Sequence, residues 1–320
     1  LVITLKPGAK IENLDCIQAG KIAGKIVSLN AYLIQFKNES EAQAARDCLS
    51  GNPDVDSIDS NFTVDRTPPL QPLDASVAPD FNLKVNQPSG DCPIVIGLVD
   101  TGSTVPASLK NLVRPPMSVF ANSQSPAPGD LTHGTAMQDT MAEMIQNAGR
   151  GSTSVQIQPM DVYGGNATTT TFDVAQGIYK VITQGHANII NLSLGSPGDS
   201  SVLHNVIRQA SEQGVVFFAA AGNEPVTTPT YPAAYPEVFA VTAGERNGQV
   251  SNYANRGNFV DMMAPGTSIV PFDGQSYFVT GTSTATAYVS GLVAGMADLQ
   301  GNCPSEVIPA VRAKLGVSFQ

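Results

Sequence analysis

Three polar residues stand at the ends of apolar or small-residue segments, and together they could perform nucleophilic chemistry. Asp100 closes the apolar run IVIGLVD, His133 opens the segment HGTAMQDTMAEM, and Ser283 lies in the turn GTS before a helix of small residues. A serine hydroxyl becomes a good nucleophile when a base removes its proton, and a third group can orient that base. Each residue also has an ordinary structural explanation: a turn-capping Asp, a structural His at a helix start, and an N-cap Ser. The question is whether the three side chains meet.

The elements that must position these residues follow from the apolar pattern of the second part of the chain. Strands are expected at residues 94–100, 154–162, 188–195, 215–222 and 238–244, and helices at residues 133–146, 172–185 and 201–214. Near-continuous apolar strands separated by helices predict an α/β fold, a mostly parallel sheet with helices on both faces. In such sheets the chemistry gathers at the carboxyl ends of the strands, where Asp100 is expected.

The first part of the chain, residues 1–67, predicts a separate small α+β unit. Its pattern reads strand, helix, strand, strand, helix, strand, which is the ferredoxin-like order with both helices on one sheet face. Residues 66–90 are rich in Pro and polar side chains, which is typical of a linker or of an arm that wraps the surface. We therefore expect two domains, 1–67 and 68–320.

The composition argues against several classes of partner. The chain of 320 residues has a formal net charge of -10, from 27 acidic and 17 basic residues, without a basic cluster. This balance argues against nucleic acid and against anionic membranes. The most apolar run, GVVFFAAAG, is about half as long as a segment that crosses a bilayer. No charged and then apolar stretch opens the chain, so we expect any signal peptide to be absent from it.

Six short motifs occur in the order that is found in the subtilisin-like serine proteases (subtilases), and the chain resembles that family from about residue 94 to residue 298. The motifs are DTG at 100–102, HGT at 133–135, SLG at 193–195, AAAGN at 219–223, MAPG at 263–266 and GTS at 281–283. The order Asp, His, Ser along the chain is the subtilisin order. The resemblance implies the subtilisin-like fold and a serine endopeptidase activity.

The resemblance also implies a role for each polar residue. Ser283 would be the nucleophile, His133 the base that later acts as an acid, and Asp100 the group that orients the imidazole. Asn223 would donate its side-chain amide to the oxyanion of the tetrahedral intermediate, beside the backbone N–H of Ser283. The glycine and small residues around Ser283 would let the turn and its helix pack closely against the sheet.

Substrate contacts are placed by the same resemblance. One wall of the cleft would consist of Ser193, Leu194 and Gly195, and the other of residues 166–170, with an extended peptide pairing between them as an added strand. The primary specificity pocket would be lined by Ala220, Ala221, Gly222 and Thr230. Small uncharged walls favour apolar or medium-sized uncharged side chains. The Tyr231–Pro232 peptide bond is expected to be cis.

The chain departs from the family at several positions. Ala136 and Asp139 stand where the family has a second His and a Gly, and Ala287 and Tyr288 stand where it commonly has Pro and His. The loop at residues 146–154 is too short for the family's high-affinity calcium loop and holds few carboxylates. We therefore assign no metal ligand and require no cofactor, and leave calcium elsewhere in the chain open.

The N-terminal unit resembles the inhibitory propeptide of these proteases, whose tail occupies the active cleft. The chain would then be cut once near Thr63 to Thr67, and it would be a monomeric proenzyme, secreted or periplasmic, that acts on polypeptides. An unrelated small domain is the alternative for this unit. For the whole chain the alternative is a pseudoprotease, a binding protein whose propeptide stays in the cleft. A lipase-like hydrolase is disfavoured, because no G-x-S-x-G motif surrounds Ser283.

The four cysteines, Cys16, Cys48, Cys92 and Cys303, contain no C-x-x-C pair, and free thiols are the ordinary alternative to disulfides. The first two lie on the two helices expected in the N-terminal unit. Cys92 lies roughly 26 Å of strand before Asp100, at about 3.3 Å per residue. The helix after Ser283 runs roughly 26 Å away from the same edge, at about 1.5 Å per residue, and Cys303 follows it. We predict the disulfides Cys16–Cys48 and Cys92–Cys303, and with them an oxidising compartment.

Overall fold

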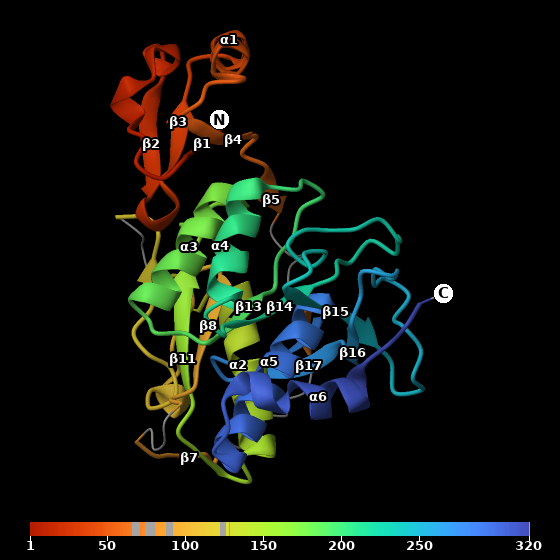
Figure 1. The fold of residues 1–320 in the computed structure, drawn as a ribbon. Coiled ribbons are helices and arrows are strands. Elements are labelled where there is room, and N and C mark those ends of the chain that lie inside the picture. The colour runs from red at the N-terminus through yellow and green to blue at the C-terminus, as the bar shows by residue number, and fades with distance from the viewer. Residues whose placement is uncertain (66–70, 74–80, 88–91, 122–125, 128, 320) are drawn as a thin grey trace.

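The computed structural model describes residues 1–65, 71–73, 81–87, 92–121, 126–127 and 129–319 (Figure 1). Its largest sheet has seven strands, all parallel, in the order β16-β15-β14-β13-β8-β11-β9. The strands are β8 (Val95–Asp100), β9 (Met117–Ser118), β11 (Gln156–Asp161), β13 (Ile189–Leu192), β14 (Val216–Ala220), β15 (Val238–Gly244) and β16 (Met262–Pro265). Every residue of β8, β13 and β14 is buried, because helices cover both faces of the sheet. The α/β fold expected from the apolar runs is confirmed.

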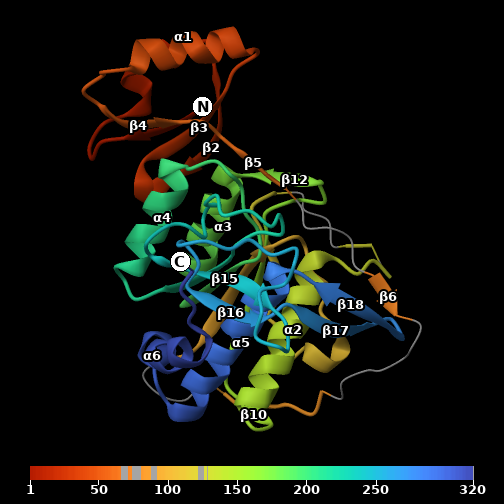
Figure 2. The same ribbon diagram turned by 90° about the vertical axis from the view of Figure 1, so that its right-hand side faces the viewer.

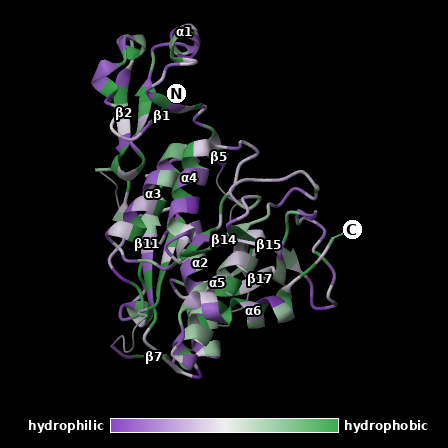
Figure 3. Ribbon diagram, in the orientation of Figure 1, coloured by the Kyte–Doolittle hydropathy of each residue, from purple (hydrophilic) through white to green (hydrophobic). Residues whose placement is uncertain are grey.

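Helices lie on both sides of this sheet (Figure 1). They are α2 (His133–Ala148), α3 (Thr171–Thr183), α4 (Ser201–Ser211), α5 (Thr282–Gln300) and α6 (Pro304–Leu315). Buried side chains of α2 and α5 belong to one hydrophobic cluster, and those of α3 and α4 to another. In Figure 3 hydrophobic and hydrophilic residues alternate around the turns of α3 and α4, as expected for helices that turn one side to a sheet.

Helix α5 is buried almost throughout, which explains its small residues. A Cβ atom added to Gly291 would lie 2.7 Å from the carbonyl oxygen of Met141, and one added to Gly295 would lie 2.7 Å from the Cβ atom of Ala148. Both contacts are too short for real atoms, so larger residues would push α5 away from α2. The close packing of these two helices therefore depends on glycine.

The N-terminal unit is a four-stranded antiparallel sheet in the order β2-β3-β1-β4. Its elements are β1 (Val2–Leu5), β2 (Lys21–Ile26), β3 (Ala31–Gln35), α1 (Glu39–Leu49) and β4 (Val55–Asp59), with 3-10 turns at Ile11–Asn13, Asp15–Ile17 and Val27–Leu29. The helix expected at residues 11–20 is wrong, since two 3-10 turns separated by the extended residue Leu14 take its place. Ten residues without a side-chain cap at Lys10 are too few to hold an α-helix.

This small sheet is covered on both faces, but by different parts of the molecule. One face packs with α1 and the 3-10 turns in a cluster that contains Ile3, Ile34 and Leu49. The other face contributes Ile26 and Ala31 to the cluster of α3 and α4. The unit therefore sits on the ends of α3 and α4, as Figure 1 shows.

Three short strands of the connecting segment pair with the larger part of the chain. They are β5 (Thr63–Asp65) on β12 (Thr168–Thr170), β6 (Gln71–Leu73) on the hairpin of β17 (Thr267–Phe272) and β18 (Gln275–Thr280), and β7 (Lys84–Val85) on β10 (Ser152–Thr153). Where it is described, the segment is an arm on the surface and not a free linker. The predicted boundary between residues 67 and 68 lies outside the described residues.

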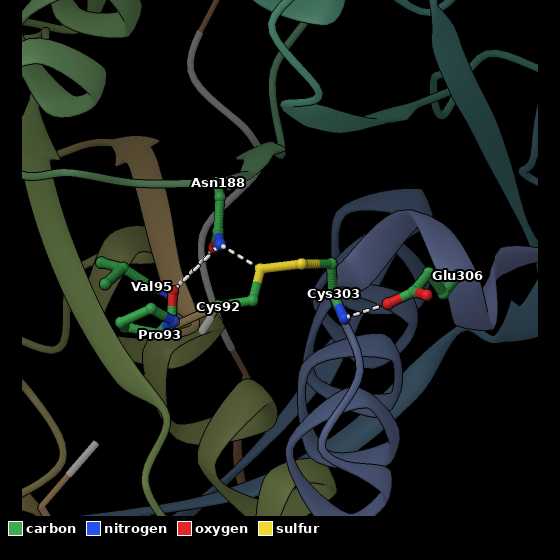
Figure 4. Close-up of a disulfide and its surroundings, with 6 residues drawn as sticks. All are labelled: Cys92, Pro93, Val95, Asn188, Cys303 and Glu306. Atoms are coloured by element: carbon green, nitrogen blue, oxygen red, sulfur yellow. Dashed lines mark hydrogen bonds between the residues drawn. A yellow bond between two sulfur atoms is a disulfide. The ribbon is translucent and has the colours of Figure 1, made fainter. Parts of the chain in front are cut away.

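Both predicted disulfides are present, Cys16–Cys48 and Cys92–Cys303. The second joins the approach to β8 with the start of α6, just beyond α5 (Figure 4). Asn188 lies beside it: its side-chain amide donates to the Pro93 carbonyl at 3.0 Å, and its carboxamide oxygen accepts from the Val95 N–H at 3.0 Å. All four cysteines are thus paired.

Candidate active site

The carboxylate and the imidazole predicted to work together do meet. Asp100 ends β8 and His133 begins α2, and His133 Nδ1 lies 2.7 Å from Oδ1 and 2.9 Å from Oδ2 of Asp100. Both side chains are buried. The Gly134 N–H donates to Thr101 Oγ1 at 2.8 Å, which ties the first turn of α2 to the end of β8. A helix start and a strand end are therefore fixed against each other at this pair.

Ser283 lies at the same edge of the sheet, in the first turn of α5. Its hydroxyl donates to the carbonyl oxygen of Ser193, the residue directly after β13, at 3.2 Å. Strand β13 is the neighbour of β8, which ends at Asp100. Within the described residues His133 Nε2 makes no hydrogen bond. The structure thus forms the Asp100–His133 bond, but the Ser283 hydroxyl is bonded to a carbonyl and not to the imidazole.

A buried chain of hydrogen bonds holds the backbone at Ser283, and the sequence did not point to it. The Ser193 hydroxyl donates to the Ser283 carbonyl at 3.1 Å, and Asn191 Nδ2 donates to the Ser193 hydroxyl at 2.9 Å. Ser290, two turns further along α5, donates to Asn191 Oδ1 at 3.0 Å. The available signal was Asn191 itself, a polar residue inside the apolar run IINL. Such networks fix one arrangement because a broken bond leaves a buried polar group unpaired.

Asn223 is held through its side-chain oxygen, and among the described residues its amide nitrogen has no hydrogen-bond partner. Its Oδ1 accepts from the Thr282 N–H at 2.8 Å and from the Thr282 hydroxyl at 3.1 Å, which leaves Nδ2 without a role in this contact. A Cβ added to Gly281 would lie 3.4 Å from Asn223 Nδ2 and 3.7 Å from the Ser283 nitrogen. Gly281 has φ 147, a conformation that L side chains rarely adopt. Two N–H donors therefore converge beside a residue that must be glycine.

The residues expected to form the specificity pocket also lie together. Thr230 donates its hydroxyl to the Ala221 carbonyl at 2.7 Å. Backbone hydrogen bonds join Ser196 and Tyr231 in both directions, at 2.9 and 2.8 Å. The Tyr231–Pro232 bond is cis, as predicted. That these groups receive a substrate side chain stays a prediction.

The predicted cleft wall at residues 166–170 is occupied by the chain itself. Its strand β12 pairs antiparallel with β5, with Thr169 opposite Val64 and Thr170 opposite Thr63. Val64 is buried and belongs to the cluster of α3 and α4. Of the predicted cutting region, Thr63 lies in this pairing, whereas Thr67 falls outside the described residues.

Asp139, the residue that departs from the family inside α2, is a buried carboxylate. It is 3% exposed, and among the described residues neither of its oxygens has a hydrogen-bond partner. Burial raises the pKa of Asp139 to about 8. One turn further along α2, burial also raises the pKa of the half-buried Glu143. Asp139 is therefore protonated over much of the acidic and neutral range, so that no buried negative charge is left unpaired there.

Two features of the described part of the chain concern metals and membranes. Within it, no group of three or more His, Cys, Asp or Glu side chains is arranged to hold a metal ion. Likewise, none of the helices that the structure describes combines the length and the apolar character needed to cross a membrane. The prediction that no cofactor is required stays untested, and calcium elsewhere in the chain stays open with no ligand assigned.

Comparison with known proteins agrees with this geometry. The chain is 29% identical to M-protease of Shouchella clausii (strain KSM-K16) over 205 residues, which cover 63% of this chain and 53% of that protein. It is 29% identical to Subtilisin Savinase of Lederbergia lenta over 205 residues, which cover 63% of this chain and 75% of Savinase. The chain therefore spans only about half of M-protease.

The fold has a close counterpart among solved structures. The epidermin leader peptide processing serine protease EpiP of Staphylococcus aureus superposes with a TM-score of 0.74 over 96% of this chain and 91% of EpiP, at 17% identity. The model of the Subtilase family matches residues 93–313, which contain the strand of Asp100 and the helices of His133 and Ser283. The chain therefore belongs to the subtilase family.

Proposed function

We propose that this protein is a serine endopeptidase that hydrolyses peptide bonds through an acyl-enzyme. The observation that carries the proposal is the Asp100–His133 hydrogen bond at 2.7 Å, formed at the sheet edge where Ser283 starts α5. A carboxylate on Nδ1 fixes the imidazole tautomer whose Nε2 can accept a proton. That Nε2 has no hydrogen-bond partner among the described residues, so it is free for the nucleophile.

In this mechanism the Ser283 hydroxyl leaves the Ser193 carbonyl and turns to His133. Nε2 takes the proton as Oγ attacks the substrate carbonyl carbon, and the carbonyl oxygen becomes an oxyanion. His133 then gives that proton to the leaving amine, and the C–N bond breaks to leave the acyl-enzyme. A water molecule, deprotonated by His133, releases the acid and restores Ser283.

The oxyanion would be bound by Asn223 Nδ2 and the Ser283 N–H. Because Thr282 occupies Asn223 Oδ1 from two sides, the amide is oriented before the substrate arrives. Preoriented donors stabilise the transition state without reorganisation, and removal of one typically costs about 3 kcal/mol. Residues Ser193, Leu194, Gly195, Ala220, Ala221, Gly222 and Thr230 would contact the substrate on the acyl side of the scissile bond.

We further propose that the N-terminal unit is an inhibitory propeptide and that the protein is made as a proenzyme. The support is the position of β5 on β12, where a substrate strand would pair. Docking is reinforced at two helix starts: Asp59 Oδ2 accepts from the Val202 N–H at 3.0 Å, and Asn61 Oδ1 accepts from the Phe172 N–H at 3.0 Å. A cut near Thr63 to Thr67 would then separate inhibitor from enzyme.

Secretion is proposed on two grounds. Disulfides persist in oxidising compartments, and this chain has two. One relative, 36% identical over 133 residues, is named Minor extracellular protease Epr of Bacillus subtilis (strain 168). We propose a monomer that acts on polypeptides, outside the cytoplasm.

One observation favours a second function, that of an inactive binding protein. Ser283 is bonded to Ser193 instead of His133, while β5 covers the cleft wall. A pseudoprotease that keeps its N-terminal unit in place would look the same.

A fluorophosphonate probe separates the two functions, because it phosphonylates only an activated serine. We expect wild-type protein, cut or with its N-terminal unit displaced by mild denaturant, to be labelled at Ser283. The Ser283→Ala variant should not be labelled and should lose about a million-fold in kcat. Wild-type protein that stays unlabelled in its cut form, while remaining folded, would establish the binding protein instead.

A further inference from the structure

Helix α5 carries a row of three hydroxyl side chains that begins directly before Ser283. Thr282, Thr286 and Ser290 follow one another at intervals of four residues, so they share one face of the helix. All three are fully buried. In Figure 2 the helix runs beside α2, with which it packs closely. Each hydroxyl of the row therefore needs a hydrogen-bond partner inside the protein.

Hydrogen bonds along the helix connect this row to the proposed oxyanion donor. The Ser290 hydroxyl donates to the Thr286 carbonyl at 2.9 Å, and the Thr286 hydroxyl donates to the Thr282 carbonyl at 2.7 Å. The Thr282 N–H in turn donates to the side-chain oxygen of Asn223 at 2.8 Å. The row thus ends at the residue whose amide would bind the oxyanion.

The other end of the row reaches across to strand β13. The Ser290 hydroxyl divides its proton between the Thr286 carbonyl and Asn191 Oδ1, which lies at 3.0 Å. Asn191 Nδ2 donates to the Ser193 hydroxyl at 2.9 Å, and that hydroxyl donates to the Ser283 carbonyl at 3.1 Å. One connected set of buried hydrogen bonds therefore leads from the oxyanion donor along α5, over to β13 and back to the residue that carries the nucleophile.

We propose that Asn191 and Ser290 are positioning residues for the peptide hydrolysis proposed above, on which this inference rests. Ser290 acts through Asn191, and Asn191 acts through the Ser193 hydroxyl, which fixes the direction of the Ser283 carbonyl. The same residue, Ser283, supplies both the nucleophilic oxygen and one N–H donor for the oxyanion. A tilt of its backbone would displace both groups together, and a misplacement of about 1 Å can lower a rate about a hundredfold.

The side-chain amide of Asn191 determines the direction of the bonds. It accepts from Ser290 and donates to Ser193, so the Ser193 hydroxyl keeps its own proton for the Ser283 carbonyl. An ionised Asp has the same shape but can only accept hydrogen bonds. With Asp at position 191 the Ser193 hydroxyl would turn its proton to the carboxylate and release the Ser283 carbonyl.

The test measures kcat and KM for a peptide anilide, and the rate of fluorophosphonate labelling. The protein is the full-length chain, cut or with its N-terminal unit displaced by mild denaturant. The test variant is Ser290→Ala, because alanine is favourable inside a helix. The matched control is Thr140→Val. Thr140 is buried in α2, and its hydroxyl donates to the carbonyl of Ala136 at 3.0 Å, four residues earlier, as Ser290 does to Thr286.

We expect Ser290→Ala to lower kcat and the labelling rate about tenfold, the effect of about one hydrogen bond, and to leave KM unchanged. Thr140→Val should lower the midpoint of urea unfolding as much as Ser290→Ala does, but should leave kcat unchanged. An unchanged kcat in Ser290→Ala, or an equal loss of kcat in both variants, would overturn the positioning role and leave the protease function in place.

Two further variants test whether Ser290 acts through β13. In a double-mutant cycle, Ser193→Ala with Ser290→Ala should lower kcat by less than the product of the two single effects, because both changes interrupt one chain of bonds. Asn191→Asp should lower kcat more than Ser290→Ala does. Independent effects in the cycle, or full activity of Asn191→Asp, would overturn the proposal. If folded, cut wild-type protein neither reacts with the probe nor cuts the anilide, the protease function itself fails.

Discussion

The two sheets of the molecule differ in what covers them. The seven-stranded sheet is buried on both faces by helices of its own part of the chain, α2 and α5 on one face and α3 and α4 on the other. The four-stranded N-terminal sheet covers one face with its own residues and gives the other to α3 and α4. A unit of this size buries only about 60% of its surface on its own, so the contact with α3 and α4 adds to the apolar area that it buries.

The N-terminal unit in turn contributes hydrogen-bond acceptors to the larger part of the chain. Helices α3 and α4 each have a residue of their own that caps the third N–H: Thr170 accepts from Asp173, and Ser200 accepts from Leu203. The second N–H of each helix is instead capped from the N-terminal unit, by Asn61 and Asp59. When the smaller part leaves, the larger part thus loses two capped donors, and its α3–α4 cluster also loses the contacts of Ile26, Ala31 and Val64.

Removal of the disulfides should cost the most stability, and it tests whether the small sheet depends on its cross-link more than the large sheet does. Cys92–Cys303 closes 211 residues and Cys16–Cys48 closes 32, which corresponds to about 5 and about 4 kcal/mol in the chain-entropy account. We expect Cys16→Ser with Cys48→Ser to unfold the N-terminal sheet locally, because about 4 kcal/mol is all that a core of its size supplies. Hydrogen exchange of β1 and β3 should approach unprotected rates.

Cys92→Ser with Cys303→Ser is the matched comparison. The larger part should lower its Tm by about 10 °C and still fold, because its two-sided core carries the rest of its stability. If β1 and β3 stay protected without the Cys16–Cys48 disulfide, the contact with α3 and α4 is sufficient to keep the N-terminal sheet folded.

The second prediction concerns Asp139. It lies in α2, which packs on the opposite face of the seven-stranded sheet from α3, α4 and the N-terminal unit. Its pKa is raised to about 8 in the folded protein, above its ordinary value of 3.8. The folded state therefore binds a proton more tightly than the unfolded chain, so its stability is full below pH 4 and falls as the pH rises to about 8. Each unit of pKa difference is worth about 1.4 kcal/mol, so the total fall is several kcal/mol.

Asp139→Asn keeps the shape of the side chain and removes the titration. Urea unfolding of the large part at pH 5, 7 and 9 should give a smaller loss of stability with pH for the variant than for wild type. Glu143→Gln, one turn away at a half-buried position, is the control and should remove a smaller part of the loss. Parallel pH curves for wild type and Asp139→Asn would place the pH dependence elsewhere.

The sequence predicted those features in which the residue type itself restricts the structure. Apolar runs long enough for buried strands predicted the parallel sheet, and the spacing of Cys92 and Cys303 from the reactive edge predicted their disulfide. Asp139 was marked as unexpected because a carboxylate has no ordinary place in a packed helix. The helix expected at residues 11–20 failed, since periodicity alone does not report that a ten-residue segment lacks a cap.

The rest depended on contacts between distant segments, which no local pattern contains. Asn191 reads as one polar residue in a strand until Ser193 and Ser290 are seen on either side of it. Strand β6 reads as part of a proline-rich linker, because its partner β18 lies about two hundred residues further on. The sequence also does not predict the rotamer of Ser283. The GTS motif places the residue at the start of a helix, but it does not determine that the hydroxyl donates to the Ser193 carbonyl.

Removal of single caps at the first turns of α3 and α4 should cost the least stability. Loss of a capping side chain costs about 1 kcal/mol, so Asn61→Ala should weaken docking by that amount. Asp59→Ala should cost about 0.5 kcal/mol more, because a carboxylate at a helix N-terminus also interacts favourably with the helix dipole.

The control is Asn38→Ala, which removes the cap of α1 inside the N-terminal unit, where Asn38 accepts from the Glu41 N–H at 2.9 Å. Hydrogen exchange of the Phe172 and Val202 amides in the intact chain should speed up about fivefold to tenfold in the first two variants and stay unchanged in the third. If Asn38→Ala speeds these amides equally, the cost of a lost cap spreads through the N-terminal sheet, and the two parts of the molecule open as one cooperative unit.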